Sequence, residues 1–336
     1  MYTKRWIPLL SALMIVLSAQ ARADNVPNRL FVVNTGDESV SLVDLEAMKE
    51  IKRLKVGASP YGVAVSPDGK RVAIGVEGEG KIKFYDTETF KPLSEVKIGE
   101  MHHDHIILTT DGKYILDANY NSDTIVGIDF ITMKEVFRIT GCSAPHVVKY
   151  GPLNKHAYVT CKKITGIAII DPAERKLVTF HQINVNPRSL TFSPDESKLY
   201  FGSFWVDGFF EMETATGKVT RLFRLPTPKD NSLPQEVTYH GCEAVSESIV
   251  LAANEGRSYV DSVNVNTGEL IDRLTKVAKP CCIERIPGTS PVRVLISNIG
   301  DATLGVAEVS TEGKLKLIGT ITVGTAPKRV AFLPTK

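Results

Sequence analysis

The chain has 336 residues, 43% of them hydrophobic, and its 40 basic and 38 acidic side chains give a formal net charge of +2. A charge this close to zero excludes the broad basic surface that is typical of a nucleic-acid-binding protein, so no nucleic-acid partner is expected. No stretch approaches the roughly 20 consecutive apolar residues that a membrane-spanning helix needs, so no membrane anchor is expected in the mature protein.

The first 23 residues are typical of an export signal. Lys4 and Arg5 form a basic start, the apolar run over residues 7–17 is short, and residues 21–23 have the small-x-small pattern of a cleavage site. Cleavage there predicts a mature protein that begins at Asp24. No cysteine lies near the cleavage site, so the prediction is a soluble periplasmic or secreted protein rather than a lipoprotein.

Residues 57–99 form the clearest copy of an internal repeat. The expected elements of this copy are a first strand at Gly62–Val65, a turn at Ser66–Gly69, and strands at Arg71–Val76, Lys81–Asp86 and Pro92–Ile98. Four short strands joined by turns make one blade of a β-propeller.

The same unit recurs at the spacing of about 40–45 residues that is typical of propeller blades. Predicted first strands begin near Gly62, His105, Val147, Ser189, Glu236, Cys282 and Arg329. They predict an all-β, seven-bladed propeller of four-stranded antiparallel blades over residues 24–336. The last blade would join the C-terminal strand 329–333 to N-terminal strands at 29–34, 39–44 and 50–56, which closes the ring without a free sheet edge.

These repeats resemble the YVTN family of β-propellers. The resemblance is carried by Leu30–Asn34, Val40–Asp44 and Gly57–Gly69. It implies the propeller fold over essentially the whole mature chain. The family includes surface-layer proteins, YncE-like periplasmic proteins and relatives of the haem d1 propeller of nitrite reductase, so the resemblance does not by itself fix a function.

The residues just before each first strand are expected to surround one mouth of the central channel, because first strands lie innermost in a propeller. Aligned blades place six prolines and His103 in one position. The next position holds Tyr61, Asp104, His146, Arg188, Gln235, Cys281 and Lys328, and the one after it holds Gly62, His105, Val147, Ser189, Glu236, Cys282 and Arg329. Such varied polar side chains favour an asymmetric binding site. The alternative is a solvated rim that tolerates polar residues.

Residues 101–105 contain three histidines, and imidazole nitrogens are ligands for copper, zinc or iron. The predicted metal ligands at the mouth are His102, His103, His105, His146, Cys281 and Cys282. The adjacent cysteines have three open interpretations, which are a redox pair, soft metal ligands and ordinary rim residues. The histidines could likewise form only a polar rim.

The histidine run also resembles the His-His-x-His signature of the nitrous-oxide reductase propeller, where such histidines bind a copper cluster. By position, His102 and His103 would be ligands. The other rim positions lack the further histidines that this family needs and hold Arg188, Gln235, Cys281 and Lys328. This departure disfavours a complete copper cluster.

The haem d1 resemblance implies a tetrapyrrole at the same mouth. His103 or His146 would be an axial ligand, and the basic side chains would pair with the carboxylates of the macrocycle. The predicted cofactor-binding residues are Tyr61, His103, His146, Arg188, Lys328 and Arg329. No Cys-x-x-Cys-His motif is present, which excludes covalent c-type haem on this chain.

Cys142 and Cys161 are expected to form a disulfide, because they lie before the first strand and at the end of the second strand of one blade. Cys242 is expected to be a buried free thiol, and His240 beside it a structural histidine.

These observations favour a periplasmic binding protein that holds a metal ion such as copper, a haem d1-like tetrapyrrole or another small anionic ligand, and passes it to a redox or envelope partner. One alternative is a non-catalytic interaction scaffold of the cell envelope. The other is a copper- or haem-dependent oxidoreductase, for which no Ser/His/Asp order or phosphate loop is recognisable.

Overall fold

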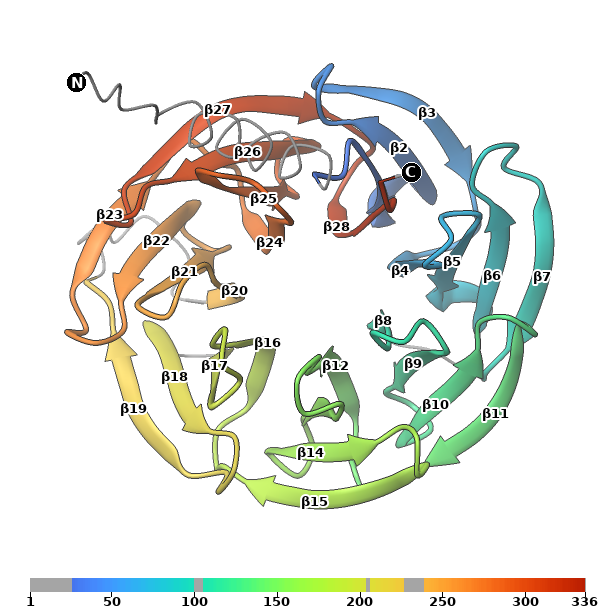
Figure 1. Cartoon of the computed structure of the whole chain (residues 1–336), viewed down its shortest axis with the longest axis horizontal. Helices are drawn as coiled ribbons and strands as arrows, with labels where there is room; N and C mark the ends of the chain where they lie inside the picture. The colour runs from blue at the N-terminus through green and yellow to red at the C-terminus, as the bar shows by residue number, and fades with distance from the viewer. Residues whose placement is uncertain (1–25, 100–104, 204–205, 227–238, 336) are drawn as a thin grey trace, which may run out of the picture.

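The computed structural model describes residues 26–99, 105–203, 206–226 and 239–335. In this part of the chain, 28 strands form seven four-stranded sheets in which neighbouring strands are antiparallel. The sheets are arranged as blades around a central axis (Figure 1). The predicted all-β, seven-bladed propeller is therefore confirmed.

Blades 1 to 6 follow the chain, and each runs from an inner first strand to an outer fourth strand. Blade 1 contains β4 (Pro60–Val65), β5 (Arg71–Val76), β6 (Lys81–Asp86) and β7 (Pro92–Lys97); blade 2 contains β8 (Ile106–Leu108), β9 (Tyr114–Asn119), β10 (Thr124–Asp129) and β11 (Lys134–Ile139). Blade 3 contains β12 (Pro145–Tyr150), β13 (Ala157–Cys161), β14 (Gly166–Asp171) and β15 (Lys176–Gln182); blade 4 contains β16 (Pro187–Phe192), β17 (Lys198–Ser203), β18 (Gly208–Glu213) and β19 (Val219–Arg224).

The remaining blades bring the two ends of the described chain together. Blade 5 contains β20 (Tyr239–Ala244), β21 (Ile249–Asn254), β22 (Tyr259–Asn264) and β23 (Leu270–Leu274); blade 6 contains β24 (Pro280–Ile286), β25 (Val292–Asn298), β26 (Thr303–Val309) and β27 (Leu315–Thr322). Blade 7 combines β28 (Pro327–Phe332) with β1 (Arg29–Asn34), β2 (Ser39–Asp44) and β3 (Lys49–Lys55). Two 3₁₀ turns, Thr35–Asp37 and Glu77–Glu79, follow β1 and β5.

The hydrophobic core lies between neighbouring blades. Between blades 1 and 2, for example, Ile82 and Phe84 pack in one apolar cluster with Ile128 and Phe130, and the two phenylalanine ring centroids are 5.8 Å apart. The strands β4 and β5 that precede them are almost wholly buried, whereas the outer strand β7 alternates between exposed and half-buried residues. No helix in the described ranges has the length and apolar character to cross a bilayer.

A β-bulge recurs near the start of the first strand in six of the seven blades. In blade 6, Pro280 is opposite Asn298 and Cys282 is opposite Ser297, so Cys281 is the extra residue. Consecutive side chains of a regular strand point to opposite faces of the sheet. The extra residue of a bulge changes the direction in which a side chain points. The Sγ atoms of Cys281 and Cys282 therefore lie on the same side, 3.0 Å apart.

The strand register corrects the predicted start of blade 5. Tyr239 is paired with Asn254, which is the place that a proline occupies in the first strands of blades 1, 3, 4, 6 and 7. The described first strand of blade 5 therefore begins at Tyr239, and the predicted start at Glu236, which lies outside the described residues, does not fit this register. His240, and not Gln235, takes the ring position next to the proline place, because the long connection after blade 4 had displaced the alignment.

Blade 3 contains the predicted disulfide. Cys142 and Cys161 are bonded, with their Cα atoms 5.2 Å apart, and the bond links the segment before β12 to the end of β13. Cys242 is a buried free thiol, as predicted.

Removal of this disulfide in a Cys142→Ala/Cys161→Ala variant is expected to lower the free energy of unfolding by about 3 kcal/mol, because the bond closes a loop with a sequence separation of 19 residues. Urea unfolding of the two proteins measures the difference. A reductant strong enough to open the bond should lower the midpoint of the wild-type protein and leave that of the variant unchanged. Equal midpoints of both proteins under oxidising conditions would contradict a stabilising disulfide.

Candidate functional site

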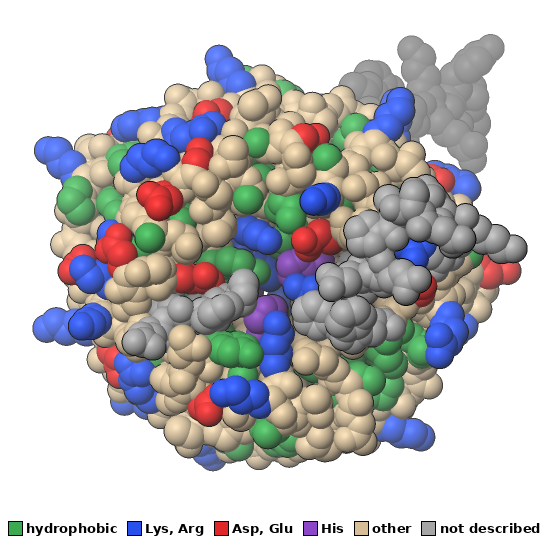
Figure 2. All heavy atoms as spheres, turned by 180° about the vertical axis from the view of Figure 1, so that it is seen from behind, with side chains coloured by type: hydrophobic (Ala, Val, Ile, Leu, Met, Phe, Trp, Pro, Cys, Tyr) green, Lys and Arg blue, Asp and Glu red, His purple; other side chains and the backbone are tan. Residues whose placement is uncertain are grey.

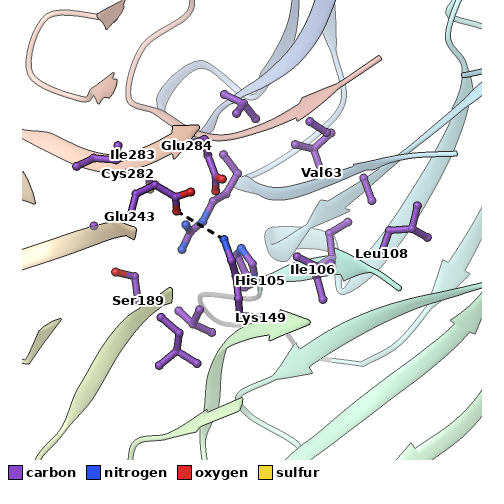
Figure 3. Close-up of a pocket in the computed structure, with 18 of the residues that line it drawn as sticks. Val63, His105, Ile106, Leu108, Lys149, Ser189, Glu243, Cys282, Ile283 and Glu284 are labelled. Carbon is purple, nitrogen blue, oxygen red and sulfur yellow. Dashed lines mark ion pairs between the residues drawn. The ribbon is translucent and has the colours of Figure 1, made fainter. Parts of the chain in front are cut away.

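The first strands of all seven blades line a cavity of about 320 Å³ inside the channel, and Figure 3 shows part of its wall. This volume is at the lower end of the range for small-molecule sites. On the face seen in Figure 2, histidine and basic side chains surround a hollow at the centre of the disc. We use the name mouth for the outer layer of the channel, which is formed by the bulge residues and the polar residues around them. The residues further along the first strands form the inner layer.

At the mouth, His240 is held between a base and an acid. An Nη2–H of Arg188 donates to Nε2 of His240 at 3.2 Å, and Nδ1 of the same ring lies 2.7 Å from Glu255. The imidazole accepts at Nε2 only when its proton is on Nδ1, so the Nδ1–H donates to Glu255. Burial, together with the charges of Arg188 and Lys328, holds the pKa of His240 well below its usual value. The ring is therefore neutral.

Basic side chains dominate the mouth. Arg188, Lys328 and Arg329 lie near the phenol of Tyr61 and interact electrostatically with it. Lys162 belongs to the same group, and burial together with the charge of Arg188 lowers its pKa to about 8. Glu255 is the acid that acts on both Arg188 and Lys328. Among the residues that the structure describes, the mouth therefore has an excess of positive charge.

Arg329 has unused hydrogen-bonding capacity. Its side chain is buried, with only 8% of the residue exposed, and neither Nε nor Nη2 has a hydrogen-bond partner in the described part of the chain. These two nitrogens form one edge of the guanidinium, which is the geometry that binds a carboxylate through two parallel hydrogen bonds. A buried donor without a partner is costly, so an anion that accepts these bonds would be bound favourably.

The inner layer has a different charge balance. Lys149 Nζ lies 3.8 Å from Glu243 Oε2, the ion pair drawn as a dashed line in Figure 3. Burial and the nearby Glu284 raise the pKa of Glu243 to about 7, although Lys149 opposes the shift. Burial lowers the pKa of Lys149, but the acids Glu284 and Glu243 outweigh it and leave the pKa raised. The inner layer thus differs from the mouth in that its base, Lys149, lies near two acids.

The adjacent thiols of blade 6 lie between the two layers. The hydrogen bond with Cys281 and the charges of Arg329 and Lys328 lower the pKa of Cys282 to about 7, against the effect of burial. The same hydrogen bond and burial raise the pKa of Cys281 well above its usual value. Cys282 is therefore the thiol on which negative charge is favoured.

The predicted cofactor-binding residues Tyr61, His146, Arg188 and Arg329 are buried or half-buried residues of first strands in blades 1, 3, 4 and 7. Lys328 Nζ lies 5.9 Å from the ring centroid of Tyr61. His103 and its neighbour His102 lie outside the described residues, so their roles stay predictions.

The predicted metal ligands that can be placed are His105, His146, Cys281 and Cys282. His105 lines the cavity in the inner layer, where burial, Arg329 and Lys149 hold its pKa well below the usual value. The group of His, Cys, Asp or Glu donors that is close enough for one ion, within the described ranges, is His240, Glu255 and Cys281, whose ligand atoms lie within 4.8 Å of one another.

Sequence reasoning missed His240 and Glu255. His240 was interpreted as structural because the misaligned blade 5 placed it too far along its strand. Glu255 directly follows β21, the strand that pairs with β20, so it reaches the same end of the blade as His240. The pairing of Tyr239 with Asn254 is the signal that would have identified both residues.

No family model matches the chain. Part of it is similar to dihydro-haem d1 dehydrogenase of Pseudomonas aeruginosa, with 28% identity over 118 residues that make up 34% of this chain and 24% of that protein. Another alignment, with protein YncE of Salmonella typhi, has 24% identity over 184 residues, which are 53% of this chain and 52% of YncE. The chain thus matches about half or less of the length of these curated relatives.

Two solved structures share the fold. Dihydro-haem d1 dehydrogenase NirN, in complex with DHE, superposes with a TM-score of 0.65 and 17% identity over 88% of this chain and 63% of that one. The periplasmic gluconolactonase PpgL of P. aeruginosa superposes with a TM-score of 0.70 and 16% identity over 92% of this chain and 99% of that one. The protein is a seven-bladed β-propeller whose channel contains a cavity lined by both polar and apolar residues. Its predicted resemblance to YncE-like and haem d1-like propellers is confirmed by these relatives.

The neutral state of His240 can be tested through the pH dependence of stability. Below about pH 6.5 the unfolded chain binds a proton at this histidine and the folded protein does not, so the wild-type protein loses up to about 1.4 kcal/mol for each further pH unit from this residue. His240→Gln lacks this loss. Its stability relative to wild type, measured by urea unfolding, should therefore increase as the pH falls from 7 to 5. A difference that stays constant across this range would contradict a buried neutral ring.

Proposed function

We propose that the protein is an exported binding protein whose channel mouth holds a small organic anion. The observation that supports this best is the buried edge of Arg329, whose Nε and Nη2 have no hydrogen-bond partner among the described residues. Arg188 and Lys328 belong to the same mouth and add two further positive charges.

Electrostatics favours an anion over a metal cation at this position. Two unit charges about 5 Å apart interact by roughly 3 kcal/mol at the effective dielectric constant of a protein site near the surface. Each of Arg188, Lys328 and Arg329 would therefore attract an anion and repel a cation by an amount of this order. A ligand carboxylate would also replace the hydration that Arg329 loses on burial.

A carboxylate-bearing tetrapyrrole is one member of this ligand class, and the haem d1 relatives give it weight. Arg188, Lys328 and Arg329 fit its acidic groups. The cavity of about 320 Å³ suits a small acid or the carboxylate groups of a larger ligand. Both ring nitrogens of His240 are engaged, which leaves the predicted His103 or His146 to face the metal. Bound haem would supply redox chemistry at its iron.

Arg329→Gln is expected to weaken anion binding at least about tenfold, because it removes the positive charge and the two-point contact while keeping a polar side chain of similar length. Haemin and citrate are suitable probes of a large and a small carboxylate, and titration calorimetry with the mature protein measures their affinities. Arg329→Lys keeps the positive charge but loses the two parallel hydrogen bonds, so it should bind with intermediate affinity.

Arg293→Gln is the matched control, since Arg293 pairs with Glu308 between β25 and β26 on an exposed part of blade 6. It should leave both affinities unchanged. Thermal unfolding checks that every variant is folded. If wild type binds neither probe, or if folded Arg329→Gln binds both as tightly as wild type, the proposed anion site is wrong, and the interaction scaffold becomes the better interpretation.

Export is part of the proposal, and it rests on the signal pattern of residues 1–23. Expression with the natural N-terminus in a bacterial host should place the protein in the periplasmic fraction, and mass spectrometry should find Asp24 at its N-terminus. Ala21→Glu should block cleavage, because the −3 position of such a site requires a small residue. Wild-type protein that retains residues 1–23 in the cytoplasm would refute export.

A further inference from the structure

The adjacent thiols of blade 6 are arranged for chemistry with each other. Cys281 is the extra residue of the bulge in β24, and its Sγ lies 3.0 Å from that of Cys282. Both residues are almost inaccessible, with exposed fractions of 0% and 3%. They are not bonded to other cysteines, since Cys142 and Cys161 bond to each other.

The channel gives a small molecule access to Cys282. Cys282 lines the cavity of about 320 Å³ together with Arg329. Arg329 and Lys328 act electrostatically on the Cys282 sulfur and favour negative charge there. A small neutral oxidant can therefore reach Cys282, whose attacking sulfur is stabilised by two neighbouring cations.

We propose that Cys281 and Cys282 are a reversible two-electron redox pair that a small hydroperoxide oxidises to a vicinal disulfide. The Cys282 sulfur gives up its proton and attacks one oxygen of the peroxide, the O–O bond breaks, and this oxygen stays on the sulfur as a sulfenic acid. The other peroxide oxygen leaves as hydroxide and takes up the proton to form water, or leaves as the alcohol where the oxidant is an organic hydroperoxide. The thiol of Cys281 then attacks the sulfenic sulfur, the S–S bond forms, and water leaves with the thiol proton. Both sulfurs are oxidised and the peroxide is reduced.

A metal ion explains the pair less well. Of the two sulfurs, only that of Cys281 belongs to the donor group that also contains His240 and Glu255. Nε2 of His240 already accepts a hydrogen bond from Arg188. A divalent ion there would also be repelled by the basic side chains of the mouth. Oxidation needs only the contact between the two sulfurs.

A disulfide between adjacent residues is strained, and strained disulfides are readily reduced. We therefore expect mild thiol reductants to reopen the pair while the buried Cys142–Cys161 bond of blade 3 persists. This inference does not depend on the proposed anion ligand, because it concerns the reactivity of the protein without any ligand.

The test uses the mature wild-type protein after mild reduction and removal of the reductant. The starting protein has three free thiols, Cys242, Cys281 and Cys282. Treatment with hydrogen peroxide should lower their number to one. Peptide mass spectrometry should find the peptide with both adjacent cysteines lighter by two hydrogen atoms, and addition of dithiothreitol should restore it. The same peptide map follows Cys142–Cys161 separately.

Three variants assign the roles. Cys242→Ser should form the vicinal disulfide at the wild-type rate and is the matched control. Cys281→Ser should stop at a sulfenic acid on Cys282 that dimedone traps. In Cys282→Ser, loss of the remaining Cys281 thiol should be at least about tenfold slower than wild-type oxidation.

Some outcomes would overturn the proposal in wild-type protein alone. One is that all three thiols survive peroxide concentrations that oxidise a free cysteine peptide. Another is that each sulfur gains oxygen independently without loss of two hydrogens. Equal oxidation rates of folded Cys282→Ser and wild type would refute the assignment of Cys282 as the attacking thiol. None of these results bears on anion affinity, so the two proposals fail separately.

Discussion

The β-bulge at the start of the first strand sets the chemistry of the channel. A regular strand points consecutive side chains to opposite faces of its sheet, and in this fold the two faces pack on the two neighbouring blades. The bulge re-aims the extra residue, as the contact between the Cys281 and Cys282 sulfurs shows. It recurs in six blades, so the ring of side chains at the mouth is denser than the period of a strand alone would allow. His240 and Lys328 occupy the same bulge position as Cys281.

The charges in the channel follow from burial. In the inner layer Lys149 interacts with the acids Glu243 and Glu284, whose charges offset its desolvation. At the mouth the bases outnumber the acid Glu255, and the edge of Arg329 lacks a partner in the described structure. An uncompensated buried charge is unfavourable for folding, and such arrangements are typical of functional sites.

The sequence predicted the propeller well because the fold depends on a repeated pattern. The turn at Ser66–Gly69 and the spacing of the blades identify seven similar units, and the disulfide follows from the position of two cysteines within one unit. The predicted proline place agrees with the strand register in blades 1, 3, 4, 6 and 7, and that of blade 2 lies outside the described residues. The prediction does not fit the register of blade 5, where the connection from Pro226 to Tyr239 interrupts the spacing. Pairing of β20 with β21 places His240 at the mouth, and such pairing is long-range information that a single sequence does not contain.

The site was harder to predict than the fold because its properties arise from neighbours that are distant in the chain. Arg188 meets His240 from the adjacent blade, 52 residues away. The low pKa of Cys282 depends on Lys328 and Arg329 of blade 7, and on a bulge that turns Cys281 toward it. Solved structures that are only 17% and 16% identical to this chain share its fold, so the propeller scaffold does not by itself fix the side chains around the channel. Function in this architecture is therefore set by seven short segments that the blades hold in place, and the chemistry of each segment depends on those beside it in the ring.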